Sequence, residues 1–261
     1  MSFKQNKFQI ANPAEPILAT AIHAGHQMSN LLQNHSNLTD EQRRYEEDPY
    51  TDDWASRFPN HIIINRSRFE VDLNRSRDKA VYLKPTDAWG IQVWKKIPPI
   101  EIINQLYECY DKFYNDLDNA IQTLTAKNPF VVVLDLHSYN HRRGGIIAPK
   151  KQNPQVNVGT GTAKNPQRWR SIIDLTINEL CKFRIDTTPL DVRENIKFKG
   201  GHMPAWLHHR YPKSVCVISI EVKKIFMDEL SGVPNNKAIL AFSDYFQNIR
   251  TVLKKNINEL K

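Results

Sequence analysis

The sequence lacks an apolar run of about eighteen residues, the length needed to cross a membrane. The stretch Met1–Ile10 is polar and has no apolar segment, so we do not expect a secretory signal peptide. Cysteine is scarce, and Cys109, Cys181 and Cys216 form neither a close pair nor a CxxC motif. These absences predict a cytoplasmic protein with no membrane association, whose cysteines are reduced and buried.

The sequence also lacks a concentrated block of charge. Lysine and arginine together number 36 against 28 acidic residues, which gives a net charge of +8 and a pI of about 9.3. The basic residues are spread along the chain, and the tightest clusters are pairs such as Lys223–Lys224. We therefore expect no nucleic-acid partner. A basic balance of this kind is also typical of a site that attracts a small carboxylate, which is the partner we predict.

Length and patterning indicate one domain spanning residues 1–261. Apolar runs and alternation predict strands, and amphipathic stretches opened by capping residues or proline predict helices. The predicted strands are Ile17–Ile22, His61–Ile64, Phe69–Leu73, Phe130–Leu136 and Val215–Ile220. The predicted helices are Thr39–Phe58 with a break at Pro49, Pro98–Ala126, Gln167–Phe183 and Asn236–Leu260. This alternation favours a three-layer α/β/α domain around a mixed, mostly parallel sheet, in which ligands bind beyond the carboxyl ends of the strands.

Three of the strongest predicted strands run into a residue that binds metals or moves protons. The strands that begin at residues 17, 130 and 215 are followed by His23, His137 and Glu221. Because parallel strands end at one edge of a sheet, we expect the three side chains to lie close together. Neutral imidazole is a good zinc ligand, and a nearby carboxylate can act as general base. The pattern predicts a hydrolytic zinc site with Glu221 as the base.

The rest of this metal site is less fully defined by the residues. Asp135 lies two residues before His137 on the same strand face, where it is expected to support the imidazole. The third ligand comes either from the acidic segment 45–52 or from His26, which follows His23 by three residues. Both options stay open on the pattern alone.

A dense group of polar donors occupies residues 65–75. The planar fork of arginine grips a carboxylate at two points. We interpret Arg75 as the main contact to a substrate carboxylate, supported by Asp72, with Asn74 and Arg66 also binding substrate. The segment is thus predicted to be the carboxylate clamp.

A second polar loop spans Lys199–His202. Paired glycines allow the backbone to approach a ligand closely. Gly200, Gly201 and His202 are therefore added to the predicted substrate site.

Several segments together resemble the N-formylglutamate amidohydrolase family, and they cover most of the chain in the family's order. They are IHAGH (22–26), EEDPYTDD (46–53), NRSRFEVDLNR (65–75), VVVLDLHSY (131–139), NVGT (157–160), FKGGH (198–202) and ISIEVKKIFMDE (218–229). The family is itself similar to zinc carboxypeptidases and to the aspartoacylase and succinylglutamate desuccinylase group. The resemblance implies a phosphorylase/hydrolase-like fold and one catalytic zinc ion per chain. It also implies a base at Glu221 and a carboxylate-binding pair at Asn74 and Arg75.

The resemblance also bears on the third ligand. The family carries an acid in the segment that matches residues 46–48, and Asp48 fits this position best, with Glu47, Glu46 and His26 as alternatives. The segment Asn140–Gly145 lies outside the family's pattern, so the resemblance does not specify the acyl group.

These observations predict a zinc-dependent hydrolase that cleaves a small N-acyl amino acid, similar to N-formylglutamate, into an amino acid and a small carboxylic acid. Zinc is held by His23, Asp48 and His137, and an arginine of the 66–68 segment, assigned as Arg68, polarises the carbonyl. One alternative is a carboxypeptidase- or amidase-like hydrolase of peptides or cell-wall fragments. Another is a non-catalytic protein that binds a small carboxylate on the same fold.

Overall fold

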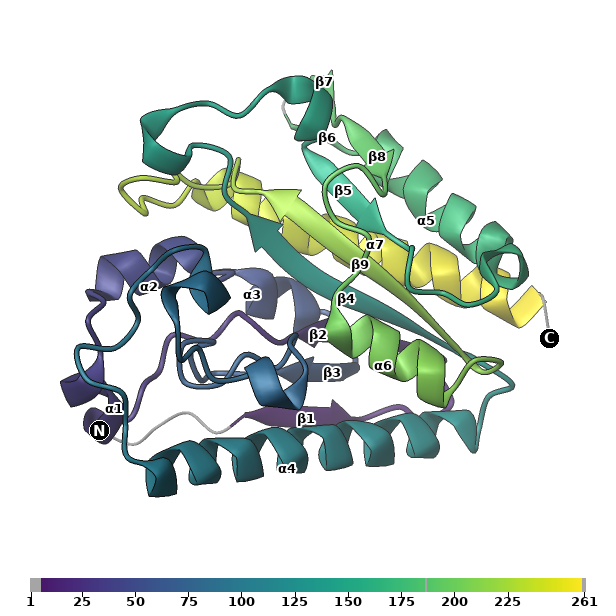
Figure 1. The fold of residues 1–261 in the computed structure, drawn as a ribbon. Coiled ribbons are helices and arrows are strands. Elements are labelled where there is room, and N and C mark those ends of the chain that lie inside the picture. Colours follow the sequence, from purple (N-terminus) through teal and green to yellow (C-terminus); the bar gives the residue numbers. More distant parts are fainter. Residues whose placement is uncertain (1–5, 186, 260–261) are drawn as a thin grey trace.

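The computed structural model describes residues 6–185 and 187–259, and its centre is one seven-stranded sheet (Figure 1). The strands run in the order β1-β3-β2-β4-β9-β5-β8, with β1 antiparallel to β3, β5 antiparallel to β9 and the other pairs parallel. Their bounds are β1 Lys7–Ile10, β2 Ile17–Ala21, β3 Asn60–Ile63, β4 Val131–Tyr139, β5 Val156–Gly159, β8 Val192–Glu194 and β9 Val215–Lys223. Strands β6 (Arg184–Ile185) and β7 (Thr188–Pro189) form a separate ribbon. The predicted mixed, mostly parallel sheet is confirmed.

Helices cover both faces of this sheet, which confirms the three layers. The α-helices are α1 Asn30–His35, α2 Asp40–Glu46, α3 Thr51–Ala55, α4 Ile100–Thr125, α5 Arg170–Lys182, α6 His202–Arg210 and α7 Asn236–Glu259. Short 3-10 turns lie at Arg77–Lys79, Pro85–Ala88, Arg143–Gly145, Lys150–Gln152 and Pro166–Trp169. Helices α3, α5 and α7 share one apolar cluster with the sheet, and α4 and α6 share the other. The predicted end of the last helix at Leu260 lies outside the described residues.

The central strands explain why the sheet is buried on both sides. Every residue of β4 is buried, as the nearly uninterrupted apolar run predicts for a strand between two helical layers. Alternate residues of β4 face opposite clusters, with Leu134 in one and Val133 in the other. No helix in the described part of the chain is long and apolar enough to cross a membrane.

The strand predicted at Phe69–Leu73 is wrong. The segment forms turns, in which the backbone N–H of Glu70 donates to the carbonyl of Ser67 and that of Arg75 donates to Asp72. Alternation was misleading because the polar members are buried too: Glu70 and Asp72 have no exposed surface. Their carboxylates accept hydrogen bonds from Ser29 and from neighbouring residues of the same segment and do not face solvent.

The prediction of buried cysteines holds only for Cys216. Cys109 on α4 and Cys181 on α5 are exposed. Both lie on the outer stripe of an amphipathic helix, where the residues that alternate with the buried stripe face solvent.

The aromatic packing under α3 gives a stability prediction. Trp54 has no exposed surface, and its ring lies 5.5 Å from that of Phe246 and 5.0 Å from that of Phe226. We expect Trp54→Ala to lower the free energy of unfolding by about 3–5 kcal/mol, because it removes a large side chain from a packed core. Urea unfolding measures the change, and Leu240→Ala, at a side chain that is 57% exposed, is the control. Equal effects of the two changes would contradict the assignment of Trp54 to the core.

Candidate active site

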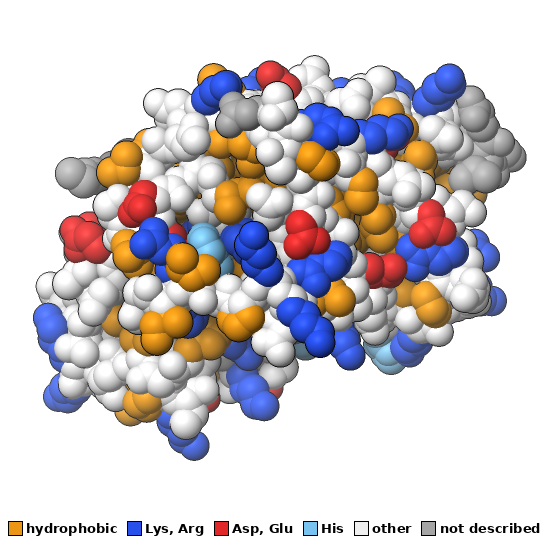
Figure 2. Space-filling view, turned by 90° about the horizontal axis from the view of Figure 1, so that it is seen from above, with side chains coloured by type: hydrophobic (Ala, Val, Ile, Leu, Met, Phe, Trp, Pro, Cys, Tyr) orange, Lys and Arg blue, Asp and Glu red, His pale blue; other side chains and the backbone are white. Residues whose placement is uncertain are grey.

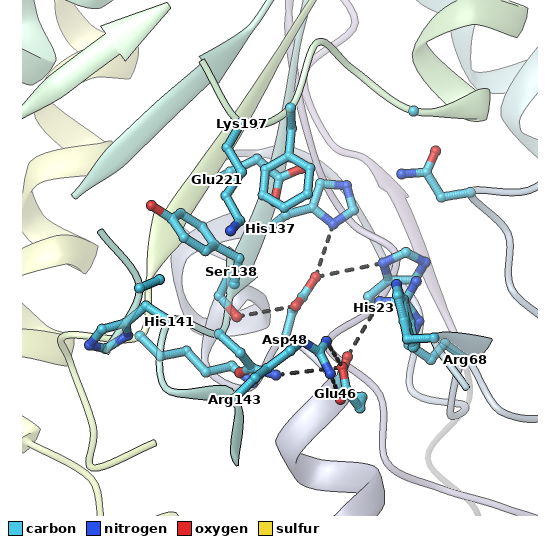
Figure 3. Close-up of a pocket in the computed structure, with 18 of the residues that line it drawn as sticks. His23, Glu46, Asp48, Arg68, His137, Ser138, His141, Arg143, Lys197 and Glu221 are labelled. Atoms are coloured by element: carbon cyan, nitrogen blue, oxygen red, sulfur yellow. Dashed lines mark hydrogen bonds and ion pairs between the residues drawn. The ribbon is translucent and has the colours of Figure 1, made fainter. Parts of the chain in front are cut away.

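Asp48 reaches the carboxyl edge of the sheet because a proline interrupts the helical segment around it (Figure 3). Helix α2 ends at Glu46, Pro49 follows Asp48, and α3 begins at Thr51. A residue before proline avoids the helical conformation. The backbone N–H of Asp48 instead donates to the carbonyl of His23 at 2.9 Å. This contact fixes the aspartate beside the end of β2.

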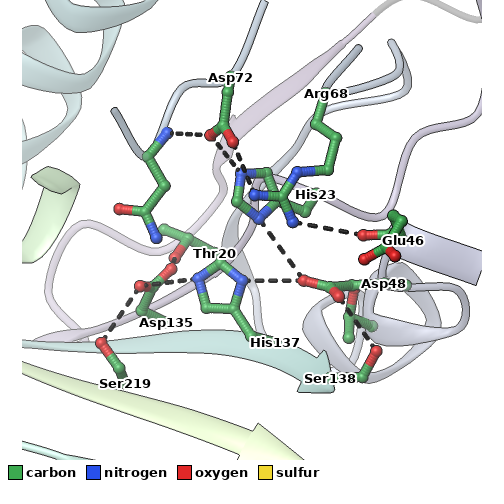
Figure 4. Close-up of polar contacts among 12 residues, drawn as sticks. Thr20, His23, Glu46, Asp48, Arg68, Asp72, Asp135, His137, Ser138 and Ser219 are labelled. Atoms are coloured by element: carbon green, nitrogen blue, oxygen red, sulfur yellow. Dashed lines mark hydrogen bonds and ion pairs between the residues drawn. The ribbon is translucent and has the colours of Figure 1, made fainter. Parts of the chain in front are cut away.

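Two histidines present the same ring atom to this aspartate (Figure 4). Oδ2 of Asp48 lies 2.9 Å from Nδ1 of His137 and 3.6 Å from Nδ1 of His23. Behind the rings, His23 Nε2 lies 2.8 Å from Asp72 Oδ1. His137 Nε2 lies 3.0 Å from Asp135 Oδ2, at an angle outside hydrogen-bond geometry. Carboxylates behind both rings favour protons on Nε2, which leaves the Nδ1 lone pairs directed at the shared centre.

The donor set fits a metal ion. Ligand atoms of His23, Asp48 and His137 lie within 4.8 Å of one another, and all three side chains are buried. Two imidazoles and one carboxylate are the ligands of many catalytic zinc sites, in which a fourth position stays open. Calcium and magnesium prefer sites built from oxygen atoms alone. The structure therefore brings together the three predicted ligands, and their role in binding zinc stays a prediction.

The charges of this cluster balance one another without a metal. Burial raises the pKa of Asp48, but hydrogen bonds from His137 and His23 outweigh it and hold the pKa well below its usual range. Burial lowers the pKa of His137, but the charges of Asp135 and Glu221 outweigh it and raise the pKa well above its usual range. A bound cation takes over the charge that this proton supplies, because metal ligands must be deprotonated.

Glu221 lies directly beside His137, since the two residues are partners in the register of β9 and β4. Both strands continue past this pair, to Tyr139 and Lys223, so the predicted strand ends were too early. The Glu221 side chain is partly exposed and lines the cavity. Burial raises its pKa to about 7. A carboxylate with such a pKa is well suited to accept a proton near neutral pH.

Arg68 lies across the two histidines from Glu221 and also lines the cavity (Figure 3). One of its guanidinium nitrogens lies 2.6 Å from Oδ2 of Asp72, and its carbon lies 4.9 Å from the centre of the Trp89 ring. Its Nε atom is buried and has no hydrogen-bond partner among the described residues. The side chain is thus held in place at the wall of the cavity.

Arg75 and Asn74 also line the cavity, and both contact Asp72, to which Arg68 is bound. Arg75 is 40% exposed, and its distance to Asp72 is 3.9 Å. The predicted support of Arg75 by Asp72 is present as this long ion pair, and Asp72 makes shorter contacts to His23 and Arg68. The sequence did not predict that Asp72 also holds a candidate metal ligand.

The glycine pair closes against this clamp. Gly200 has φ +107°, and a Cβ on Gly201 would lie 2.2 Å from the Asn74 amide, so neither position accepts another residue without strain. Both glycines line the cavity. Two predicted substrate-binding residues lie elsewhere: His202 begins α6 with its ring against Tyr114, and Arg66 binds Glu70. Neither is among the described residues that line the cavity.

The alternative ligands have partners of their own. His26 Nδ1 lies 2.5 Å from Glu47 Oε2. Glu46 accepts two hydrogen bonds of 2.6 Å from Arg143. These contacts leave Asp48 as the carboxylate that faces both histidines.

A cavity of about 700 Å³ opens over these residues. Its wall includes three basic residues that sequence reasoning did not single out, Arg143, Lys197 and Lys224. Figure 2 shows the molecule from above, with a histidine between basic and hydrophobic side chains on this surface. The volume falls in the range of about 300–1,000 Å³ that is typical of small-molecule sites.

Comparisons with known proteins identify the family and the fold. A sequence model of the family described as N-formylglutamate amidohydrolase matches residues 15–227. The crystal structure of N-formylglutamate amidohydrolase from Ralstonia eutropha JMP134 is similar in fold, with a TM-score of 0.77 and 14% identity over 98% of this chain and 99% of that chain. A gene product of Agrobacterium tumefaciens has a TM-score of 0.61 and 14% identity, over 95% of this chain and 94% of that chain. A search of curated proteins found no match.

Proposed function

The chain belongs to the N-formylglutamate amidohydrolase family, and from this premise we propose that it hydrolyses the amide bond of an N-acyl amino acid, with one zinc ion per chain. Water is added across the C–N bond, which yields a free amino acid and a carboxylic acid. The observation that carries the proposal is the convergence of His23, Asp48 and His137 beside Glu221 in one cavity.

Each side chain of the site has a distinct part in this proposal. His23, Asp48 and His137 would hold zinc, which when bound supplies Lewis-acid polarisation of a carbonyl and makes water more acidic. Glu221 accepts a proton from the attacking water and passes it to the leaving amine. Arg68, which lines the cavity, donates to the carbonyl oxygen as negative charge develops on it.

The amino-acid half of the substrate lies on the side of Arg75 and Asn74. Arg75 has no carboxylate closer than 3.9 Å among the described residues, so its guanidinium is available for a ligand carboxylate. Gly200 and Gly201 bring the backbone close to the same place. This arrangement supports recognition of the α-carboxylate next to the scissile amide.

The proposal is tested by metal analysis together with a panel of N-acyl amino acids. We expect about one zinc per chain. We also expect release of the free amino acid, which is measured by detection of its amine. Removal of the metal with a chelator should abolish the activity, and zinc should restore it. A zinc-loaded protein that hydrolyses no member of the panel would contradict the proposal.

Arg75→Ala is expected to raise KM for an N-acyl amino acid far more than for its α-amide. A hydrogen bond between charged groups contributes about 1.5–3 kcal/mol, which is roughly a 10- to 100-fold change. Arg77→Ala is the matched control, because Arg77 lies two residues away and is bound to Asp111 on the surface. Steady-state kinetics on both substrates gives the comparison, and equal losses on acid and amide would show that Arg75 does not contact the carboxylate.

A further inference from the structure

The part of the cavity beyond His137 is basic, and the proposed mechanism does not use it. We call it the lysine end and define it by Tyr139, Arg143, Lys197 and Lys224, all of which line the cavity. Figure 3 shows Arg143 and Arg68 on opposite sides of the Asp48–His137 pair. Arg68 and Arg75 both approach Oδ2 of Asp72, so the proposed α-carboxylate clamp lies on the side of Arg68, across the reaction centre from Arg143.

Lys224 is the most unusual residue of the lysine end. Its side chain is only 2% exposed, yet it lines the cavity. Its Nζ donates to the carbonyl oxygen of Tyr45 at 2.5 Å, and no carboxylate of the described residues lies within 4.0 Å of it. Burial lowers its pKa to about 8. An anion beside Lys224 would stabilise the charged form that burial disfavours.

The other two cations lie close to Lys224 or face the same space. Arg143 and Lys224 approach one ring, that of Tyr45, at 6.0 and 5.7 Å from its centre. Lys197 lies 5.0 Å from the centre of the Tyr139 ring and donates to the amide oxygen of Asn153 at 2.6 Å. Within the described residues, Lys197 has no carboxylate at ion-pair distance either.

Nearby acids offset the charge of the two lysines, but among the described residues none forms an ion pair with either of them. Glu46 lines the cavity, and both of its oxygens are bound by Arg143. Lys197 and Lys224 consequently bring two positive charges to the cavity wall without a paired carboxylate. Lys224 is buried and Lys197 is exposed, and a cavity wall that carries both charges attracts an anionic ligand group.

We propose that the lysine end binds an acyl group that carries its own carboxylate, so that the substrate is an N-(ω-carboxyacyl) amino acid. This inference rests on the proposed function, because it places the scissile carbonyl between the clamp and the lysine end. Hydrolysis then adds water across the amide bond and yields a dicarboxylic acid and an amino acid. The cavity of about 700 Å³ has room for such an acyl chain beside the amino-acid half.

A purely structural role for Lys224 makes a different prediction. The lysine also lies near Asp48, Glu46 and Glu229, whose charges favour its protonated form. If it served only to offset these acids, its loss would weaken every substrate equally. Selectivity for a charged acyl group over a neutral one of the same size therefore separates the two roles.

The test uses the zinc-loaded full chain and three derivatives of L-glutamate. The N-succinyl derivative carries the acyl carboxylate, the N-succinamoyl derivative has the same size without the charge, and the N-formyl derivative lacks the chain. We expect kcat/KM for N-succinyl to exceed that for N-succinamoyl by about 10- to 100-fold, as a charge-assisted contact predicts. A ratio near one would overturn the proposal.

Variants assign the selectivity to residues. Lys224→Met is expected to bring the ratio near one, and Lys197→Met to lower it severalfold, while Lys197→Arg should retain most of it. Lys199→Met is the matched control, because this exposed lysine of the same loop does not line the cavity. If Lys224→Met fails to fold, Lys197→Met against Lys197→Arg still decides the question. Equal losses of kcat/KM on the N-succinyl and N-succinamoyl compounds in these variants would overturn the assignment of the selectivity to the two lysines.

The panel distinguishes failure of this inference from failure of the proposed function. Hydrolysis of N-formyl-L-glutamate with no preference for the succinyl over the succinamoyl compound overturns only the proposal that the lysine end binds an acyl carboxylate. A zinc-loaded protein that cleaves none of these amides, nor any other N-acyl amino acid, overturns both.

Discussion

Glu221→Gln is expected to leave zinc bound and the fold intact while kcat falls by about 10²–10⁴-fold. Glutamine has the size of glutamate and still forms hydrogen bonds, so packing beside His137 should survive. It cannot accept a proton from water, and general base catalysis is worth about this factor. KM should change little, because binding of the substrate does not require the proton transfer.

Two readings, zinc content and kcat, separate the roles open to Glu221. Loss of zinc would mark it as a ligand, and near-normal turnover with full zinc would show that the base is another group. Glu108→Gln is the control, since Glu108 is exposed on α4. It should change neither reading.

His137→Ala is expected to remove stoichiometric zinc and with it nearly all hydrolysis. One of three protein ligands is lost, and the carboxylates of Asp48 and Asp135 are left facing a buried gap. Lewis-acid catalysis is worth several kcal/mol, so activity should fall on the order of 10³-fold or more. Metal analysis after dialysis and activity assays on the same sample test both parts.

The control for this change is His209→Ala, at an exposed histidine on α6. A His137→Ala protein that keeps one zinc per chain would rule out His137 as a ligand. Loss of zinc together with loss of secondary structure would instead point to misfolding, and circular dichroism distinguishes this outcome.

The sequence was sufficient to predict the central strands of the sheet and the placement of His23, His137 and Glu221 around one cavity at its edge. Strands β4 and β9 are apolar on both faces, so their position in the centre of a layered fold follows from the pattern. Short strands were missed: β5 and β8 have only four and three residues, and their pairing with β9 and with each other depends on contacts far apart in the chain. Periodicity carries little information at that length.

The site was predicted where local chemistry restricts the backbone and missed where the fold alone sets the environment. Asp48 precedes a proline, and this restriction keeps it out of the adjoining helices. The contact of Asp72 with His23 was missed because turns replace the expected strand at residues 69–73, and they bring this carboxylate to His23. The burial of Lys224 depends on Tyr45 and its neighbours, which lie 179 positions away in the sequence. Local sequence patterns therefore do not predict it.

The buried carboxylate of Asp135 also affects how the central strands align during folding. Its carboxylate has no exposed surface and accepts hydrogen bonds from Thr20 on β2 at 2.8 Å and Ser219 on β9 at 3.3 Å, its direct partners in the two registers. A one-residue shift of β2 would place Ala19 or Ala21 opposite this carboxylate and leave it without that donor. A buried polar group left without a partner costs about 1–3 kcal/mol. The strands are apolar enough to pair in several alignments, and Asp135 makes misaligned pairings of this kind unfavourable before any ligand is bound.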